Sequence, residues 1–426
     1  MRVLISATGS HGDIHPFIAI GRALLARGHH AALLTNPYFQ PLTEQAGLEF
    51  IPLGEPLDLR DLKDTPDVMH PRKGSKVVVR ELMVPFARDT LTHLPRILDD
   101  FKPDAVLHHH ICLATAWVCQ QRSIPTANAV LAPMMWMSRG DTFSPFASSP
   151  LHPPAWLRWL MSRTLRPLIK LQMNPPFNRL RREHSLPPLD DVWRDACRTG
   201  TINLGLWSPL FRAPLPEDPP TGVICGFPWH DQVADQEHTP DAVERFLTAG
   251  PPPVLFSLGT AAVHVARDFY QTAADACRLI GRRAMLLVGN SGVTVTNPPP
   301  GVATFTYIPF SRVMPRVAAS VHHAGIGTTA QGLRAGRPTL LIPHAHDQYD
   351  NAARAKRLGV SDTLNRARLT PRRLADSLLS VLDNPTMEAN ATVLAARLKN
   401  EDGASIAADH IEKLTASPAP ALSSSA

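Results

Sequence analysis

The chain lacks the features that mark disulfide-stapled and membrane-spanning proteins. Its cysteines lie far apart and form no Cys-x-x-Cys pair: Cys112, Cys119, Cys197, Cys225 and Cys277. We therefore expect reduced, buried thiols and a cytoplasmic protein. The opening stretch MRVLISATGSHGDIHPF lacks the long apolar segment of a signal peptide. No run of about 18 apolar residues occurs, so no membrane-spanning helix is expected.

Neither sign of charge is in large excess. The chain has 43 Lys and Arg residues against 37 Asp and Glu residues, which gives a net charge of +6. This balance does not indicate a nucleic-acid-binding protein, and it is compatible with an anionic substrate or an anionic membrane surface. The 426 residues exceed one ordinary core, so two domains of about 200 residues each are expected.

Strand-like and helix-like segments alternate in both halves of the chain. In the first half, residues 2–7 and 30–35 have the pattern of buried strands, and residues 14–27 between them have helical spacing. The same alternation resumes at residue 254 and continues to about residue 358. Repeated strand–helix–strand units build doubly wound parallel sheets. The sequence therefore predicts an α/β fold with two Rossmann-like domains.

Three regions depart from this alternation. Residues 133–220 are rich in Pro, Arg and Trp, and the Pro-rich segment 213–220 is expected to link the two domains. Near the C-terminus, residues 371–382 and 387–414 have helical spacing. The Ser-, Ala- and Pro-rich tail that follows is expected to be disordered.

A glycine-containing turn in residues 322–351 gives the strongest functional signal. A predicted strand ends at His322, and Gly325, Gly327 and Thr328 form a tight turn into a helix. Glycines let a backbone approach a ligand, and a helix N-terminus offers unpaired N–H groups and a partial positive charge. The turn therefore predicts a diphosphate site. Its Gly-x-Gly-x-x-Ala spacing is also a weak dinucleotide fingerprint, which leaves a nicotinamide-dependent oxidoreductase as an alternative.

Three polar residues accompany this turn. His323 follows the strand directly and can donate a hydrogen bond to a phosphate oxygen, while Asp347 and Gln348 follow the next predicted strand. Open α/β sheets bind ligands at this edge. Asp347 and Gln348 are therefore candidates to hydrogen-bond sugar hydroxyls.

The segment resembles the donor-binding signature of inverting glycosyltransferases with the GT-B fold. That superfamily includes plant secondary-product, bacterial antibiotic and sterol glycosyltransferases. The matching positions are its phosphate-binding histidine, its diphosphate turn, its sugar-binding Asp-Gln pair and the asparagine that follows: His323, Gly325, Gly327, Thr328, Asp347, Gln348 and Asn351. The resemblance implies two Rossmann-like, doubly wound parallel-sheet domains that face a cleft.

Other donor-site residues follow from the same resemblance, with one departure. Many members have a glutamate that grips both ribose hydroxyls, and this chain has Gln331 there. A neutral amide suits a deoxyribose at least as well as a ribose, so both dTDP-sugars and UDP-sugars are candidate donors. Tyr307 and Ile308 stand where the family stacks an aromatic on the base, although Tyr307 could equally be a core residue. Gly259 and Thr260 resemble the loop over the phosphates.

The turn after the first strand is where this family carries its catalytic base. The usual Gly-His-x-x-Pro pattern reads Gly-Asp-Ile-His-Pro over residues 12–16, so Asp13 stands at the base. A carboxylate within reach of an acceptor hydroxyl can take its proton. The alternatives are that Asp13 only caps the helix, or that the neighbouring His11 or His15 is the base.

A run of three histidines, His108 to His110, follows another strand in the same half. His109 falls near the position of the family's residue that orients the base, so one hypothesis pairs Asp13 with His109. Zinc binding by the three histidines is the rival. Neighbours on a strand point to opposite faces, which disfavours it.

The resemblance also implies a division of the chain. It places an acceptor-binding domain over residues 1–215, a nucleotide-sugar-binding domain over 216–385, a helix that packs back on the first domain over 386–415, and a disordered tail over 416–426. Residues 155–183 mix Trp, Leu and Met with Arg and Lys. They predict an amphipathic lid over the acceptor or a peripheral contact with the inner membrane.

The implied activity is transfer of a hexosyl group from a UDP- or dTDP-sugar to a hydroxyl of a hydrophobic small molecule or lipid. Inversion is expected, and no cofactor or metal is expected. Three segments are most similar to the rhamnolipid-type rhamnosyltransferases within the superfamily: the opening GSHGDIHPF, the run RDFY over residues 267–270, and AHDQYDNA over residues 345–352. A sugar-nucleotide epimerase and a non-catalytic glycosyltransferase-like partner remain alternatives beside the oxidoreductase.

Overall fold

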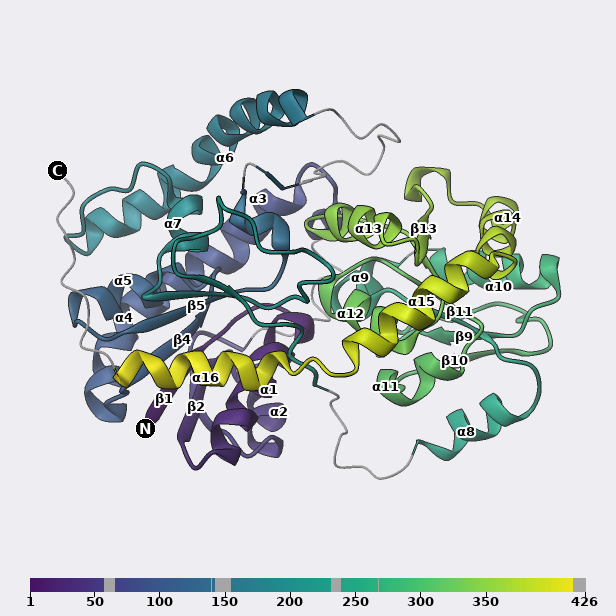
Figure 1. Ribbon diagram of the computed structural model, residues 1–426, viewed down its shortest axis with the longest axis horizontal. Coiled ribbons are helices and arrows are strands. Elements are labelled where there is room, and N and C mark those ends of the chain that lie inside the picture. Colours follow the sequence, from purple (N-terminus) through teal and green to yellow (C-terminus); the bar gives the residue numbers. More distant parts are fainter. Residues whose placement is uncertain (57–65, 139, 142–154, 231–238, 267, 417–426) are drawn as a thin grey trace.

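The protein consists of two α/β halves that lie side by side (Figure 1). Its structure is a computed structural model that describes residues 1–56, 66–138, 140–141, 155–230, 239–266 and 268–416. Each half is built on a twisted sheet in which every strand pairing is parallel. The predicted α/β architecture with two doubly wound sheets is confirmed.

Within the described residues, the N-terminal sheet has seven strands in the order β3-β2-β1-β4-β5-β6-β7. These strands are β1 (Arg2–Ser6), β2 (His30–Thr35), β3 (Glu49–Pro52), β4 (Ala105–His109), β5 (Thr126–Val130), β6 (Ile202–Gly205) and β7 (Gly222–Ile224). Helices α1 (His11–Ala26), α4 (Val84–Phe101), α5 (Leu113–Gln121), α6 (Ala155–Glu183) and α7 (Val192–Arg198) belong to this half. Strands β4 and β5 are fully buried, and β1 is buried after Arg2, because helices cover both faces of the sheet, as the apolar runs predict.

The C-terminal sheet has six described strands in the order β10-β9-β8-β11-β12-β13. These strands are β8 (Val254–Ser257), β9 (Ala284–Leu287), β10 (Val302–Phe305), β11 (Ala319–His322), β12 (Thr339–Leu341) and β13 (Ser361–Thr363). Its helices include α9 (Gly259–Ala262), α10 (Phe269–Ile280), α11 (Phe310–Val313), α12 (Ile326–Ala335), α13 (Gln348–Arg357) and α14 (Pro371–Leu382).

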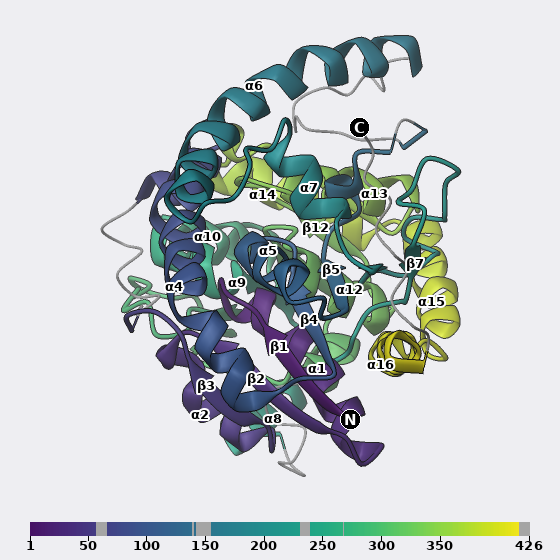
Figure 2. The same cartoon turned by 90° about the vertical axis from the view of Figure 1, so that its left-hand side faces the viewer.

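The chain passes between the halves twice, and both passages differ from the expected positions. The Pro-rich segment 213–220 is not the link, because it leads into β7, the last strand of the N-terminal sheet. The expected helix over 387–414 is two helices, α15 (Pro385–Leu398) and α16 (Gly403–Ala416). Figures 1 and 2 show α15 against the C-terminal half and α16 against the N-terminal half, where it packs on α1.

Two glycines let these passages touch. A Cβ added to Gly403 would lie 2.4 Å from the carbonyl oxygen of Gly226, so only glycine fits there without a backbone shift.

The predicted boundary after residue 385 stays a prediction, and the tail from residue 417 lies outside the described residues. All five cysteines are buried and unpaired, as expected. No described helix is long and apolar enough to cross a membrane.

A buried network of ion pairs connects the N-terminal half to α13. Arg354 of α13 contacts the carboxylates of Asp141, at 2.9 Å, and Asp350, at 2.6 Å. Arg212 contacts the other oxygen of Asp141 at 3.2 Å and also pairs with Asp218. The side chains of Arg354 and Asp141 are only 3% and 5% exposed. The network therefore fixes α13, which begins at Gln348 of the predicted sugar-binding pair, against the first half.

Replacing Arg354 with methionine is expected to lower the free energy of unfolding by about 3–5 kcal/mol, because the buried carboxylates of Asp141 and Asp350 each lose an ion pair with the guanidinium. Urea unfolding would measure the loss. The matched control is Arg372→Met, which breaks the pair with Asp376, whose two side chains are 79% and 55% exposed. That change is expected to cost less than about 1 kcal/mol. Equal losses in the two variants would contradict the assigned role of the network.

Candidate functional site

A strained turn connects β11 to α12 at the predicted diphosphate site. Ala324 has a positive φ of 66°, which a non-glycine residue adopts only where its surroundings hold it. Its N–H donates to Nδ1 of His322 at 3.1 Å, and its carbonyl oxygen accepts from Nδ2 of Asn351 at 3.0 Å. These two hydrogen bonds fix the direction in which the backbone enters α12.

The His323 imidazole is enclosed by two glycines. A Cβ on Gly325 would lie 2.5 Å from Nε2 of His323, and a Cβ on Gly259 would lie 2.6 Å from its Cε1. Gly259 also has a positive φ of 68°. Burial lowers the pKa of His323 to about 4, so the ring is neutral near pH 7 and retains one N–H donor. The ring therefore lies at the N-terminus of α12, with the loop of Gly259 and Thr260 against it.

The first turn of α12 is open on the side of Gly327. No atom lies within 4 Å of a Cβ added to this residue, and the residue is exposed. Helix α12 begins at Ile326 after Gly325, and its first N–H groups have no partner within the helix. The predicted diphosphate turn of Gly325, Gly327 and Thr328 thus presents an approachable helix N-terminus.

The predicted sugar-binding pair lies where the loop after β12 enters α13, with Asp347 as the N-cap residue and Gln348 as the first residue of the helix. The Oε1 atom of Gln348 accepts from the N–H groups of His344, at 2.8 Å, and Ala345, at 3.0 Å. Gln348 therefore shapes the loop in this structure. Asp347 accepts from Nδ2 of Asn351 at 2.7 Å. Because Asn351 also holds the carbonyl of Ala324, one amide connects this loop to the diphosphate turn.

Burial raises the pKa of Asp347 to about 7, and the neighbouring charge of Asp13 adds to the rise, while the Asn351 hydrogen bond opposes it. Between about pH 4, near the pKa of an unfolded aspartate, and pH 7 the folded protein therefore holds a proton that the unfolded chain releases. The free energy of unfolding contributed by this group falls as pH rises through that window.

The Asp347→Asn variant cannot ionise, so it is expected to be more stable than the parent protein above pH 7, by on the order of 3 kcal/mol. The difference should vanish towards pH 4. Melting temperatures measured from pH 4.5 to pH 8 would test this, with Asp376→Asn as the control at an exposed carboxylate. A stability difference that is the same at every pH would show that Asp347 is already ionised in the folded protein.

Asp13 occupies the third position of α1 and not the N-cap, because the helix begins at His11, earlier than expected. Ser10 is the N-cap, and its N–H and hydroxyl groups donate to Oδ2 of Asp13 at 2.7 and 3.0 Å. No described residue donates a hydrogen bond to Oδ1. Burial raises the pKa of Asp13, although Ser10 and His346 counteract the rise. One oxygen caps the helix, and the other stays available as a proton acceptor.

The Asp13 carboxylate lies at the interface with the C-terminal half. Its charge influences both His346 and Asp347, which are on the loop after β12. Helix α1 packs against α9 and α12, the elements of the predicted phosphate site. His346 itself reaches the N-terminal half, where its Nε2 lies 2.9 Å from the carbonyl oxygen of Val68. The structure therefore brings the predicted base and the predicted donor loop together.

His109 lies elsewhere in the same half. Its Nδ1 atom is 3.3 Å from the carbonyl oxygen of Thr8, its ring packs on Phe17, and no hydrogen bond joins it to Asp13. Burial lowers its pKa to about 3. The hypothesis of a direct pair between Asp13 and His109 therefore finds no contact in support. His11 and His15 pack edge to face on one another at 5.6 Å, beside Asp13 on α1.

The three consecutive histidines do not converge on one point. Among the residues that the structure describes, no group of three or more His, Cys, Asp or Glu side chains has the geometry of a metal site. The expectation that the reaction needs no metal stays a prediction.

The predicted nucleoside-binding residues lie beyond the diphosphate turn. Ile308 is 3% exposed and packs in the core beside α11, so only its backbone can face a ligand. Tyr307 is partly buried. Gln331, one helical turn beyond Thr328 on α12, lines a pocket of about 670 Å³.

Sequence reasoning missed three contributors to the site. Ser10 stands three residues before Asp13, which is the spacing of a capping box and could have been recognised. His346 directly precedes the Asp-Gln pair, but nothing in its surroundings indicated that it crosses to Val68. Trp229, which lines the same pocket as Gln331, gave no local signal at all.

Two Rossmann-like domains that meet across such a site define the GT-B class of glycosyltransferase. The sequence profile described as the Glycosyltransferase family 28 N-terminal domain matches residues 3–125. The profile described as the Erythromycin biosynthesis protein CIII-like C-terminal domain matches residues 284–413. The chain is 30% identical to the O-mycaminosyltylonolide 6-deoxyallosyltransferase of Streptomyces fradiae, over 97% of each protein.

The chain therefore belongs to the GT-B glycosyltransferases with a family 28 N-terminal domain and an erythromycin CIII-like C-terminal domain, which confirms the resemblance in the sequence. It is also 27% identical to a sterol 3-beta-glucosyltransferase of Arabidopsis thaliana, over 95% of this chain and 64% of the plant protein. Solved structures share the fold. The glycosyltransferase of kitacinnamycin has a TM-score of 0.74 at 20% identity, covering 97% of this chain and 99% of that one. The spinosyn forosaminyltransferase has a TM-score of 0.72 at 18% identity, covering 98% and 100%.

Proposed function

We propose that this chain transfers a hexosyl group from a UDP- or dTDP-sugar to the hydroxyl group of a hydrophobic small molecule or lipid, with inversion. The observation that carries the proposal is the position of Asp13 beside the His346–Asp347 loop, where α1 packs on α12. Two relatives are named for transfer of a sugar to O-mycaminosyltylonolide and to a sterol, which supports a hydrophobic acceptor. A structural neighbour, the spinosyn rhamnosyltransferase, was solved with thymidine diphosphate.

The chemistry requires one base and one anion site. The acceptor oxygen attacks the anomeric carbon from the face opposite the diphosphate, and a new C–O bond forms as the bond to the diphosphate breaks. The nucleoside diphosphate leaves with the bonding electrons, and Oδ1 of Asp13 takes the acceptor proton. The N–H groups of the first turn of α12 and the His323 ring stabilise the negative charge that develops on the leaving group.

Helix α6 is the element that we assign to the hydrophobic acceptor. Figures 1 and 2 show that its first turns stand away from the sheets. Leu160, Leu168 and Leu171 on this helix are 45%, 60% and 72% exposed. Two of its cations are neutralised by the next segment, since Arg166 and Lys170 pair with Asp191 and Asp190. The apolar face therefore supports an acceptor surface, and peripheral membrane contact stays a prediction.

A thermal-shift panel of dTDP, UDP, GDP and NAD tests the donor class, because a ligand that binds only the folded state raises the melting temperature. Stabilisation by dTDP or UDP is expected. Stabilisation by NAD alone would point to an oxidoreductase, and no shift with any nucleotide would favour a non-catalytic protein.

Transfer itself is then tested with dTDP- and UDP-sugars and a set of hydrophobic alcohols. Proton NMR of the product gives the anomeric configuration. A product whose anomeric configuration is retained would contradict the single-displacement mechanism.

A further inference from the structure

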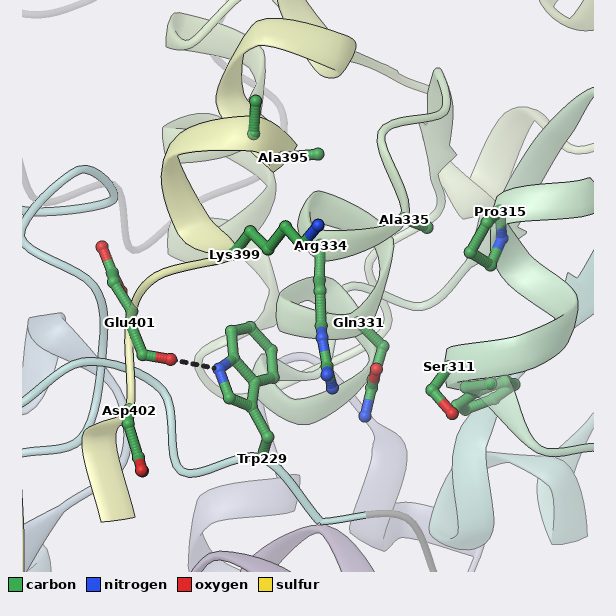
Figure 3. Close-up of a pocket in the computed structure, with 12 residues that line it drawn as sticks. Trp229, Ser311, Pro315, Gln331, Arg334, Ala335, Ala395, Lys399, Glu401 and Asp402 are labelled. Carbon is green, nitrogen blue, oxygen red and sulfur yellow. Dashed lines mark hydrogen bonds between the residues drawn. The ribbon is translucent and has the colours of Figure 1, made fainter. Parts of the chain in front are cut away.

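A pocket of about 670 Å³ lies where the two passages of the chain between the domains meet α12 (Figure 3). Its walls include Gln331 and Arg334 of α12, Ser311 of α11, Trp229 of the first passage and Lys399 of the second. The volume is within the range of about 300–1,000 Å³ that is usual for small-molecule sites.

The face of α12 relates this pocket to the diphosphate turn. Thr328, Gln331 and Arg334 follow one another at intervals of three residues, so they lie along one side of the helix. Three residues of an α-helix rise by about 4.5 Å, which is close to the spacing of diphosphate, pentose and base along an extended nucleotide. With a diphosphate at the N-terminus of α12, the pentose comes to Gln331 and the base comes to Arg334.

The pocket wall formed by α11 also indicates that the base lies at the Arg334 end of α12. Phe310 and Ser311 line the pocket, and only Pro309 separates them from Tyr307 and Ile308, which are expected to meet the base. The pocket therefore lies between the two elements that the family resemblance assigns to the nucleoside. The segments that connect the two domains form the remaining walls of the pocket, and the family resemblance assigned no role to their residues.

Arg334 is held in place by an aromatic ring from the first passage. Its Cζ atom lies 4.8 Å from the centroid of the Trp229 ring. The ring is fixed in turn, because its Nε1 donates to the carbonyl oxygen of Glu401 at 3.0 Å and it packs against Phe227 at 5.5 Å. In the described part of the chain, Arg334 has no carboxylate partner and no hydrogen bond. Its guanidinium N–H groups are therefore available to a ligand, and they face the pocket beside Gln331 (Figure 3).

We propose that Arg334, positioned by Trp229, is a specificity-determining residue that donates hydrogen bonds to O4 of a uracil or thymine base in the donor. This inference rests on the proposed function. A guanidinium donates and never accepts, and uracil and thymine present an acceptor at O4 where cytosine presents an amino donor. Cytidine nucleotides are therefore disfavoured, while UDP and dTDP bind alike, because Gln331 places no carboxylate on the ribose hydroxyls.

The test is the affinity of the full chain for UDP, dTDP and CDP, measured by titration calorimetry. The parent protein is expected to bind UDP and dTDP within a few-fold of each other and CDP at least about tenfold more weakly, as for one lost charged hydrogen bond. In Arg334→Gln, the amide can both donate and accept. The ratio of CDP to UDP affinity should approach one. Trp229→Leu should shift the ratio in the same direction, since the guanidinium loses its support.

The control is Arg337→Gln, which removes the same charge just beyond α12 but outside the pocket, where Arg337 donates to the carbonyl of Pro315 and pairs with Glu388. It should leave the ratio unchanged. A uniform loss of affinity for all three nucleotides in Arg334→Gln would overturn base recognition by this residue, and so would unchanged affinities. Absence of binding by the parent protein would instead contradict the proposed function itself.

Discussion

Replacing Asp13 with asparagine should slow glycosyl transfer by about 10²–10⁴-fold, the usual contribution of a general base. The asparagine oxygen still accepts from Ser10, which now donates to Oδ2 at 2.7 Å, so the start of α1 is retained. What the variant loses is the ability of Oδ1 to take a proton. The rate of transfer, measured at saturating donor and acceptor, should therefore fall without a comparable change in nucleotide affinity.

Two comparisons separate catalysis from helix capping at this position. Ser10→Ala removes one hydrogen bond to Oδ2 but leaves the carboxylate, so it should lower stability by about 1 kcal/mol and retain most of the transfer rate. The pH–rate profile of the parent protein should rise through the pKa of Asp13, and that limb should be absent in Asp13→Asn. If Asp13→Asn kept the parent's rate and profile, His11 or His15 would become the candidate base.

The Gly327→Ala variant should separate ligand binding from stability at the diphosphate turn. A Cβ there meets no atom within 4 Å, so the folded protein accepts it without strain. Alanine is favoured over glycine in a helix by up to about 1 kcal/mol, and the melting temperature should stay the same or rise. The added methyl group occupies the side on which a diphosphate would approach the N–H groups. Affinity for dTDP and UDP should therefore fall at least about tenfold, or 1.4 kcal/mol.

The matched control lies on the same helix. A Cβ on Gly332 would lie 3.5 Å from Nε2 of His322, which is ordinary contact, and this residue is well beyond the first turn. Gly332→Ala should leave nucleotide affinity unchanged. Unchanged affinity in Gly327→Ala as well would mean that the diphosphate does not approach this turn.

Local patterns predicted much of the fold. The apolar runs over residues 2–7 and 30–35 predicted strands β1 and β2, which are observed at Arg2–Ser6 and His30–Thr35. Strands of a parallel sheet are buried on both faces, so each one is a continuous run of apolar residues that can be recognised locally in the sequence. The turn from β11 to α12 was likewise predicted by its glycines, which the close approach of His323 requires.

What the sequence did not reveal depends on contacts between distant residues. Trp229 hydrogen-bonds Glu401, 172 residues further on, and Arg354 pairs with Asp141 in the other half. Neither contact leaves a periodic signal. The expected continuous helix over 387–414 was wrong because the chain must change domains near Gly403, and helical propensity does not report such a change. His346 was overlooked because its partner, Val68, is also distant in the sequence.

The central claim is that backbone N–H groups after His323 hold a diphosphate while Asp13 faces the sugar from the other domain. A crystal structure with dTDP or UDP tests it most directly. The account predicts diphosphate oxygens within about 2.7–3.2 Å of the first N–H groups of α12. It also predicts that Oδ1 of Asp13 is directed at the space beyond the terminal phosphate, where the transferred sugar would lie. A nucleotide bound away from this turn, or an Asp13 side chain directed away from it, would contradict the account.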